Sequence, residues 1–337
     1  MPALAVAAAL RADGAEVVWV GGERAEAQLV PAAGYELHPI AVEGLSRTSP
    51  LRAARALVRS ARAVAHARRL LGELRPAAVM GGGGYVSGPV GLAALSRGIP
   101  LVLTEADSHM GLANRVLAPF AQRVCLAFPV SRRTGARYRV YGRPVPRLDG
   151  DRAGARRWLG LSDGEVCVLV FGGSLGARSI NQAAVHGLSG SGLRVLHIAG
   201  RRDYRELAAR ALGADYDLRE YLDTEDFDRA LAACDLVVAR AGGSVFEIAA
   251  HGRPAILVPY PHASADHQTA NARWMAEAGA AVVVCDGELS GARLAREVSR
   301  LVGDPARLAA MAQASKRLAR PQAAREVAGE LLSAAAR

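Results

Sequence analysis

The chain has 337 residues, 51% of them hydrophobic, and a formal net charge of +10. This length and apolar content exclude a disordered or fibrous protein and suffice for two ordinary domain cores. The charge is a poor indicator of nucleic-acid binding, because Lys316 is the single lysine and only 5% of the residues are aromatic, too few for base stacking. No run reaches the ~18 apolar residues of a membrane span, and Met1–Leu10 lacks a basic leader, which predicts a cytoplasmic chain.

Short apolar runs alternate with longer segments rich in alanine and arginine. This alternation predicts buried parallel strands separated by helices, with ligands at the carboxyl ends of the strands. The four cysteines lie in or beside such runs without C-x-x-C spacing, so buried reduced thiols are expected. The predicted strands are Glu16–Val20, Ala77–Met80, Leu101–Thr104, Arg123–Phe128, Val166–Phe171, Arg194–Ala199, Leu236–Ala239, Ala255–Pro259 and Ala281–Cys285.

The segment Tyr141–Pro146 divides the chain, because its two prolines forbid a helix. We therefore predict an N-terminal domain over 1–142, a C-terminal domain over 143–320 and a closing amphipathic helix over 321–337. Each domain is expected to be doubly wound, and the two are expected to face one another across a cleft. The chain starts in a helix pattern, so the first sheet is expected to lack the strand that usually precedes this helix. Either the true start lies upstream, or the first domain is incomplete.

Two glycine clusters each follow an apolar run and precede a segment with helical character. They are Gly81–Gly84, followed by Tyr85, and Gly172–Gly176, which contains Ser174. Glycine lets the backbone approach a ligand closely, and the next helix aims free N–H groups at an anion. In the second cluster the amides and the Ser174 hydroxyl would hold a nucleotide diphosphate; the alternative is a tight turn that needs glycine only for packing.

A third loop, Gly242-Gly243-Ser244, follows the run Leu236–Ala239 and leads to Glu247. The spacing of Ser244 and Glu247 is typical of a capping box, in which each side chain satisfies a backbone donor of the first helical turn. A carboxylate in this place can instead accept both hydroxyls of a ribose. The spacing alone leaves the two interpretations about even.

The connection Pro259–Asn271 is unusually polar. His262, Asp266 and His267 could bind a metal, but no further ligands follow at a recognisable spacing. Recognition of sugar hydroxyls by Asp266, His267 and Gln268 fits better, because carboxylate and amide groups match hydroxyl donors and acceptors. A solvated helix start is the remaining alternative.

Two further patterns lie in the first half. Glu105, Asp107 and His109 follow a predicted strand and are candidate acid–base groups, each with a capping or orienting role as the alternative. Between Pro50 and Pro76, basic residues recur every three or four positions along a predicted helix, which favours a solvated face or, alternatively, contact with anionic lipid headgroups. These basic residues are Arg52, Arg55, Arg59, Arg62, His66 and Arg69.

Nearly the whole chain resembles the MurG-type glycosyltransferases, which transfer N-acetylglucosamine from UDP-N-acetylglucosamine to undecaprenyl-diphospho-N-acetylmuramoyl-pentapeptide in peptidoglycan synthesis. The resemblance implies the GT-B fold, in which the second Rossmann-like domain binds the donor and the first binds the lipid acceptor. The segments that carry it are Met1–Leu10, Gly81–Pro89, Glu105–Arg115, Gly172–Asn181, Arg240–Gly252 and Pro259–Ala272.

The resemblance also implies roles for single residues. Ser174, with Gly173 and Gly176, would meet the donor diphosphate, and Glu247 would bind the ribose. The backbone of Leu222 would meet uracil, and Asp107 is the candidate base on the acceptor side. The other implied site residues are Gly242, Gly243 and Ser244 beside the nucleotide, His267 and Gln268 at the donor sugar, and Gly82, Gly83, Gly84 and Tyr85 at the acceptor diphosphate.

The implied activity is an inverting transfer at the cytoplasmic face of the cell membrane, with neither a metal nor another cofactor. The chain departs from the family pattern in lacking the first strand and its G-x-G-G-H loop, and in having Asp107 where asparagine is usual. These departures leave two alternatives open. The chain could be another UDP-sugar enzyme of the same fold, such as a glycolipid synthase or a 2-epimerase, or a non-catalytic UDP-sugar-binding protein.

Overall fold

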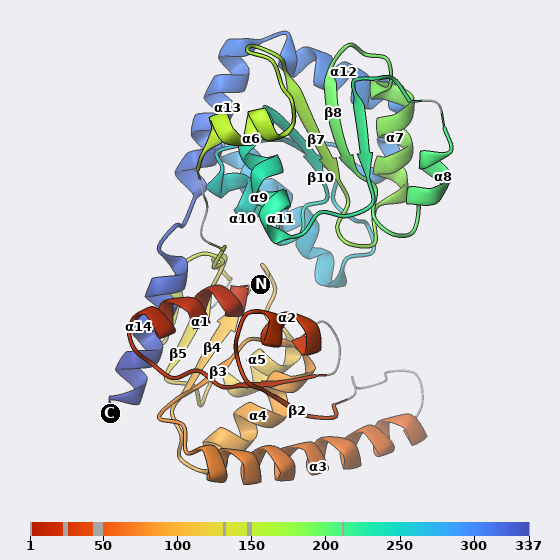
Figure 1. Ribbon diagram of the computed structural model, residues 1–337. Coiled ribbons are helices and arrows are strands. Elements are labelled where there is room, and N and C mark those ends of the chain that lie inside the picture. The colour runs from red at the N-terminus through yellow and green to blue at the C-terminus, as the bar shows by residue number, and fades with distance from the viewer. Residues whose placement is uncertain are drawn as a thin grey trace. The chain divides into compact units, whose positions relative to one another are not determined.

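The computed structural model describes residues 2–22, 26–42, 50–130, 133–146, 150–210 and 212–336, except for the side chains of 50–60 and 264. The chain forms two compact units (Figure 1). One consists of Met1–Pro146 and Arg320–Arg337, and the other of Arg147–Ala319. All strand pairs among the described residues of both units are parallel, which confirms the predicted α/β class.

The unit Arg147–Ala319 is built, within its described residues, on a six-stranded sheet in the order β12-β11-β10-β7-β8-β9. Along the chain, the strands after β7 first extend the sheet to one side and then, from β10 on, to the other. The order therefore reverses between β7 and β10, which is where doubly wound sheets bind ligands. The strands are β7 (Cys167–Phe171), β8 (Arg194–Ile198), β9 (Tyr216–Arg219), β10 (Leu236–Ala239), β11 (Ala255–Leu257) and β12 (Ala281–Val283).

The central strands of this sheet are apolar at every position because helices cover both faces. All five residues of β7 and all four of β10 are buried. On one face, Val168 and Val170 pack with Ile180 and Val298 of two helices. The helices and short 3-10 turns of the unit are α6 (Arg152–Trp158), α7 (Arg178–Leu188), α8 (Tyr204–Ala208), α9 (Thr224–Ala233), α10 (Val245–Ala250), η1 (Ser264–Asp266), α11 (His267–Glu277), η2 (Asp286–Glu288), α12 (Gly291–Val302) and α13 (Pro305–Leu318).

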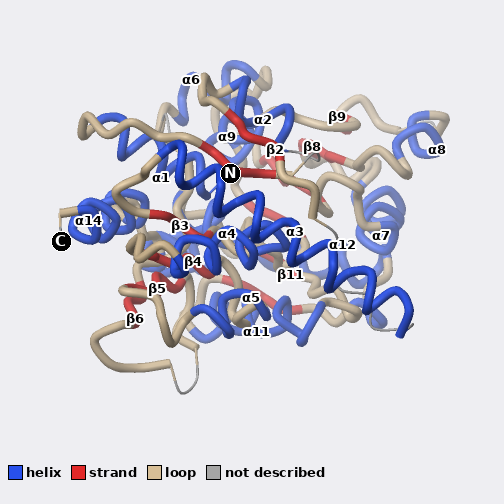
Figure 2. Tube along the Cα trace, turned by 90° about the horizontal axis from the view of Figure 1, so that it is seen from below, coloured by secondary structure: helices blue, strands red, loops and turns tan. Residues whose placement is uncertain are grey.

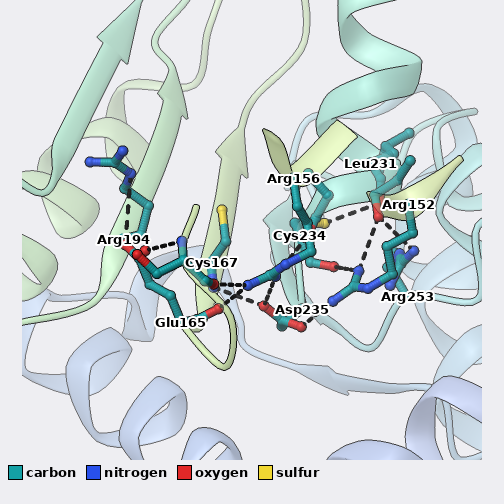
Figure 3. A network of polar contacts seen from close by, with 12 residues as sticks. Arg152, Arg156, Glu165, Cys167, Arg194, Leu231, Cys234, Asp235 and Arg253 are labelled. Atoms are coloured by element: carbon teal, nitrogen blue, oxygen red, sulfur yellow. Dashed lines mark hydrogen bonds and ion pairs between the residues drawn. The ribbon is translucent and has the colours of Figure 1, made fainter. Parts of the chain in front are cut away.

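A network of charged side chains closes the amino end of this sheet (Figure 3). Asp235, directly before β10, accepts hydrogen bonds from Arg152 at 2.5 Å, from Arg156 at 3.3 Å and from the backbone N–H of Cys167 at 2.9 Å. Arg152 also donates to the carbonyls of Ala232 and Cys234. The amino end is thus occupied by internal contacts, and the glycine loops lie at the opposite, carboxyl end.

The other unit contains two sheets in its described residues, a four-stranded one in the order β3-β4-β5-β6 and a pair β1-β2 (Figure 2). No described strand joins the two sheets. The strands are β1 (Trp19–Gly21), β2 (Leu37–Pro39), β3 (Val79–Gly81), β4 (Leu101–Glu105), β5 (Arg123–Leu126) and β6 (Tyr138–Val140). The helices are α1 (Pro2–Ala12), α2 (Glu26–Ala32), α3 (Pro50–Leu74), α4 (Gly84–Ser96), α5 (Leu112–Leu117) and α14 (Ala323–Ala335).

The alternation of side chains along β4 divides the core of this unit. Leu101 and Leu103 point to the cluster that includes α3, α4 and α5, whereas Val102 packs against α1 and α14. The predicted closing helix is thus present as α14, and its Val327 and Leu331 are buried. Leu332 of this helix is exposed, because the buried stripe continues through Ala334 instead.

The predicted strands are all present, within a few residues of the expected bounds. Three of the strands in the described part of the chain were not predicted, β2, β6 and β9, and each lies at the edge of its sheet. The expectation of buried cysteines is correct for Cys125, Cys167 and Cys234 and wrong for Cys285, which is exposed because β12 ends before it at Val283. Burial raises the pKa of the Cys125 thiol to about 12 and that of Cys234 to about 11, so both stay protonated.

Helix α3 confirms the predicted helix after Pro50. Arg62, His66 and Arg69 are exposed on it, whereas the side chains of Arg52, Arg55 and Arg59 lie outside the described part of the chain. In that described part, no helix is both long and apolar enough to span a bilayer.

We expect Asp235→Asn to lower the free energy of unfolding by about 2 kcal/mol, because Arg152 and Arg156 lose the carboxylate that offsets their charge. Urea denaturation monitored by circular dichroism measures this. The matched control is Glu225→Gln, which breaks an exposed pair with Arg229 on one helix and should change stability by about 0.5 kcal/mol or less. Equal effects of the two substitutions would contradict the role assigned to the network.

Candidate functional site

The loop Gly172–Gly176 connects β7 to α7 at the carboxyl end of the sheet, beside the point where the strand order reverses. Gly173 and Gly176 have φ of 94° and 81°, a region that L side chains rarely adopt. A Cβ on Gly176 would lie 2.0 Å from the carbonyl oxygen of Ala199, so only glycine fits. Ser174 is exposed. The loop therefore presents the Ser174 hydroxyl on the surface directly before α7, whose first-turn amides have no acceptor within the helix, as an anion site requires.

The loop after β10 is held by Arg240. Its guanidinium donates to the carbonyls of Val258 at 3.1 Å and Pro259 at 3.2 Å, to Asp286 at 2.5 Å and to the Ser179 hydroxyl at 2.9 Å. Ser179 in turn donates to Asp286 at 2.6 Å. These contacts join α7, β10, β11 and η2 at the carboxyl end of the sheet. No sequence pattern predicts this cluster, because its members are far apart along the chain.

Helix α10 begins after Ser244, as predicted, but the Ser244 side chain makes no capping hydrogen bond. The hydrogen bond that Ser244 would accept in a capping box is therefore not formed. Gly242 and Gly243 precede Ser244 in the loop, and Glu247 lies half-buried in the first turn of the helix. A role for Glu247 as a hydroxyl acceptor stays a prediction.

The polar connection after β11 has a strained backbone. Ala265 and Asp266 both have φ of 53°, which is uncommon for residues other than glycine. Asp266 accepts a hydrogen bond from Thr269 at 2.6 Å, and the amide oxygen of Gln268 accepts one from the Tyr260 N–H at 3.0 Å. Asp266 and Gln268, which were predicted to bind sugar hydroxyls, thus also form hydrogen bonds within their own loop. The amide nitrogen of Gln268 takes no part in these two bonds.

The turn after β9 carries Tyr221 and Leu222. The Leu222 side chain is buried, which leaves its backbone as the part able to meet a ligand. Tyr221 is exposed, and the Arg201 guanidinium lies 5.7 Å from the centre of its ring. The predicted donor-side residues all follow strands of one sheet at its carboxyl end: Gly173, Ser174, Gly176, Leu222, Gly242, Gly243, Ser244, Glu247, His267 and Gln268.

In the other unit, the glycine cluster leads from β3 into α4. Gly83 and Gly84 have φ of 82° and 73°, and Gly83 occupies the position before the helix. Gly82 and Gly84 are exposed, and so is Tyr85, at 62%. The structure thus confirms a glycine-dependent turn into a helix, while its role toward an acceptor diphosphate stays a prediction.

Glu105 is buried at the end of β4 and organises the loop after it. One carboxylate oxygen accepts from the Gly111 N–H at 2.8 Å and from the Asn114 amide at 3.0 Å, and the other from the Asp107 N–H at 3.3 Å. This is the orienting role offered as the alternative to acid–base chemistry. Asp107 is half-buried and His109 is exposed. With Glu105 engaged in the loop, Asp107 is the candidate acid–base group that lies nearer to the end of β4.

A buried polar cluster that the sequence did not indicate lies behind Gly172–Gly176. It consists of Asn181, His197, Asp203 and Tyr216, all of them buried. Burial lowers the pKa of His197 to about 4. Burial tends to raise the pKa of Asp203, but hydrogen bonds from Arg202 and Asn181 and the charges of Arg202 and Arg178 outweigh it, so that the pKa lies below its usual value. No group of three or more potential metal-binding side chains occurs among the residues described.

Models of two protein domains match the chain. The N-terminal domain of glycosyltransferase family 28 matches residues 1–126, and the C-terminal domain of the same family matches residues 167–327. The two matched regions together cover most of the chain. The first lies within one unit, and the second covers most of the other unit and continues over residues 320–327, which belong to the first unit.

Relatives align along nearly the whole chain. One from Rubrobacter xylanophilus is 43% identical over 98% of this chain and 98% of its own length, and one from Moorella thermoacetica is 42% identical over 96% and 92%. Both are named UDP-N-acetylglucosamine–N-acetylmuramyl-(pentapeptide) pyrophosphoryl-undecaprenol N-acetylglucosamine transferase.

Among solved structures, MurG of Acinetobacter baumannii is similar with a TM-score of 0.78 and 30% identity, covering 98% of this chain and 95% of that one. The calicheamicin glycosyltransferase CalG4 has a TM-score of 0.70 at 17% identity, covering 100% and 95%. UDP-GlcNAc 2-epimerase from Neisseria meningitidis has a TM-score of 0.66 at 13% identity, covering 99% and 98%. The last two likenesses concern the fold alone.

We expect Gly176→Ala to lower the free energy of unfolding by roughly 3 kcal/mol, because the positive φ and the contact with Ala199 O both oppose a methyl group. The matched control is Gly192→Ala, with φ of 73° and no atom within 4 Å of the added carbon. It isolates the backbone term, about 1 kcal/mol. Equal losses in urea denaturation would show that Gly176 does not need its close approach.

The low pKa of His197 predicts a pH dependence of stability. Because unfolded histidine titrates near 6.5, the unfolded chain binds a proton between pH 6.5 and about 4 that the folded chain does not. Stability is therefore lost as the pH falls through this window, by about 2 kcal/mol between pH 7 and pH 5. Urea denaturation at both pH values should show that His197→Gln lacks this loss, while His262→Gln, at an exposed position, retains it. An unchanged loss in His197→Gln would contradict the assignment.

Proposed function

The chain belongs to the MurG group of glycosyltransferase family 28, and we propose that it transfers N-acetylglucosamine from UDP-N-acetylglucosamine to the lipid-linked N-acetylmuramoyl-pentapeptide of peptidoglycan synthesis. The observation that carries the proposal is the loop Gly172–Gly176. Its two positive-φ glycines bring the backbone to the surface at the reversal of strand order, directly before α7. That geometry suits the diphosphate of a nucleotide sugar.

The donor is placed by assigning its parts to the loops at the carboxyl end of this sheet. The diphosphate meets Gly173, Ser174 and Gly176, where the dipole and the amides of α7 stabilise negative charge. The ribose lies at Glu247, in the helix turn after Gly242, Gly243 and Ser244. The uracil lies against the backbone of Leu222, and the sugar meets His267 and Gln268.

The proposed reaction is a single displacement with inversion. The acceptor hydroxyl attacks the anomeric carbon, the new glycosidic bond forms as the bond to the diphosphate oxygen breaks, and UDP leaves with that electron pair. The hydroxyl proton passes to Asp107, the proposed base. Amides of the loop and of α7 stabilise the charge that develops on UDP. Gly82, Gly83, Gly84 and Tyr85 are proposed to meet the diphosphate of the acceptor.

A lipid-linked acceptor calls for contact with the membrane surface, and we place the enzyme peripherally at its cytoplasmic face. Support comes from exposed apolar side chains on and beside α5, namely Leu112 at 57%, Val116 at 53% and Phe120 at 66%. Basic side chains are also exposed in the same unit, on α3, which packs against α4 as α5 does. Apolar and basic surface together is what binds an anionic bilayer without insertion of a helix.

The proposed function is tested by UDP release from UDP-N-acetylglucosamine with and without a lipid-linked muramoyl-pentapeptide. We expect release only when the acceptor is present, and a new disaccharide by mass spectrometry. Glu247→Gln should raise the KM for the donor about tenfold or more with the acceptor KM unchanged, because it removes a charged hydrogen-bond acceptor from the ribose. Conversion of the donor without acceptor, or binding of the donor without release, would contradict the transfer.

The same assay tests the base. Asp107→Asn keeps the size of the side chain and removes its basicity, so kcat should fall by about 10² or more while the donor KM is little changed. The matched control is His109→Gln in the same loop, at an exposed position, which should retain activity. Full turnover by Asp107→Asn would reject Asp107 as the base and leave the transfer itself standing.

A further inference from the structure

Four buried side chains form a continuous line of hydrogen bonds behind the proposed diphosphate loop. The Tyr216 hydroxyl lies 2.9 Å from Nδ1 of His197, and Nε2 of His197 lies 3.0 Å from Oδ1 of Asn181. The Asn181 amide nitrogen donates to the Ala199 carbonyl at 2.9 Å and to Asp203 at 3.0 Å. We call these four residues, Tyr216, His197, Asn181 and Asp203, the buried relay. It runs from β9 through β8 and α7 to Asp203, just before α8.

The chemistry of its partners fixes the direction of every bond in the relay. A carbonyl and a carboxylate can only accept, so the NH₂ group of Asn181 must face Ala199 and Asp203. Oδ1 of Asn181 therefore faces His197, whose Nε2 must carry the proton. Nδ1 of the neutral ring is then the acceptor for the Tyr216 hydroxyl. A single tautomer and a single amide orientation satisfy all four side chains.

Charge at one end holds this arrangement. Asp203 is 3% exposed and also accepts from Arg202 at 3.1 Å, while its ion pair with Arg178 measures 3.4 Å. The anion therefore keeps the Asn181 amide turned toward it. The imidazole is fully buried and neutral, so it adds no charge that would compete with Asp203.

The relay ends on the backbone that supports the glycine loop. The Ala199 carbonyl that Asn181 holds is the atom against which Gly176 packs, and a Cβ on Gly200 would lie 2.2 Å from the Gly176 nitrogen. The N–H groups of Ala199 and Gly200 donate to the carbonyls of Arg219 and Glu220, at the end of β9. One short segment of backbone therefore connects the loop Gly172–Gly176 with the turn that carries Leu222.

We propose that His197 and Tyr216 are positioning residues for the donor nucleotide, acting through Asn181 and Ala199 to fix the backbone that receives its diphosphate and its base. This inference rests on the proposed function for the identity of the ligand. Neither side chain touches the ligand. They set the distance between two loops that bind opposite ends of UDP, because the Ala199–Gly200 segment contacts one loop and pairs with the strand before the other.

The apolar surroundings support a positioning role. Tyr216 of the relay lies in the apolar core cluster that also contains Val195 and Ile180. Polar groups in such a place cost free energy unless all of them are paired, and here each retains a partner. Hydrogen bonds between polar side chains fix a single orientation of those side chains and of the backbone that they hold. A ligand-binding loop requires such a fixed orientation, whereas a hydrophobic core does not.

The test measures UDP binding by calorimetry with two substitutions of one residue. His197→Gln places an amide nitrogen near the position of Nε2 and keeps a donor for Asn181. His197→Asn reaches only the position of Nδ1 and leaves Asn181 without its partner. We expect the Kd for UDP to stay within about twofold of the unsubstituted chain in the first and to rise about tenfold in the second.

The control is Val298→Ala in α12, a buried position of the same core outside the relay. It lowers stability and removes no hydrogen bond of the buried relay, so UDP affinity should be unchanged. A Kd for His197→Asn equal to that of the unsubstituted chain would overturn the positioning role, as would an equal loss of affinity in Val298→Ala. If the unsubstituted chain itself binds no UDP, the proposed function fails and this inference with it.

A second readout does not depend on the His197 variants folding. Histidine labelled with ¹⁵N reports the tautomer by NMR, and His197 should show the Nε2–H form, with its signals shifted by UDP although the ring lies out of reach of the ligand. Tyr216→Phe removes the donor to Nδ1 and frees the ring on that side, so an about fivefold higher Kd for UDP is expected, while the Nε2–H form is retained because Asn181 still requires it. A ring that shows the Nδ1–H form in the unsubstituted chain would overturn the proposal.

Discussion

Parallel pairing is the constraint from which the rest of the structure follows. In a parallel sheet all strands have their carboxyl ends on the same side, and the helix after each strand starts there. In the unit Arg147–Ala319, the loops after all of its described strands therefore lie together at the carboxyl end of the sheet, and Asp235 with its arginines lies at the amino end. The amino end must satisfy its own polar groups. The carboxyl end must leave backbone amides available for a ligand.

The sequence predicts every central strand but misses three of the edge strands, β2, β6 and β9. One physical reason accounts for the difference. A strand such as β7 is covered on both faces, so all of its residues are apolar and the run stands out. An edge strand has one free side. β9 reads Tyr-Asp-Leu-Arg and β6 reads Tyr-Arg-Val, and no apolar run separates either from the loops around it. Their pairing depends on a neighbour whose position only the fold supplies.

The same division applies to the candidate site. The glycine loops could be predicted because the requirement for glycine is local, as at Gly176, where backbone conformation and a close approach coincide. The contacts that hold these loops could not, since Arg240 meets Asp286 only after β10, β11 and β12 have lined up. Glu105 belongs to a pattern with two interpretations, an acid–base role and an orienting role. The hydrogen bonds that its carboxylate accepts from Gly111, Asn114 and Asp107 fit the orienting role, and these partners are known only once the loop is folded.

The Arg240 guanidinium already has partners within the protein, which affects how the charge of a donor diphosphate would be neutralised. Its guanidinium is engaged by Asp286, by Ser179 and by two carbonyls, and Asp286 already offsets its charge. Under the proposed function, Arg240 therefore holds the ends of neighbouring strands together and does not bind the phosphate. The negative charge of the diphosphate is stabilised by the oriented amides of Gly172–Gly176 and α7. Amides carry no net charge and stabilise an anion only while their orientation is held. A site of this kind depends more on rigid backbone than one built on arginine, which is why buried side chains such as His197 and Tyr216 can matter for a ligand that they do not touch.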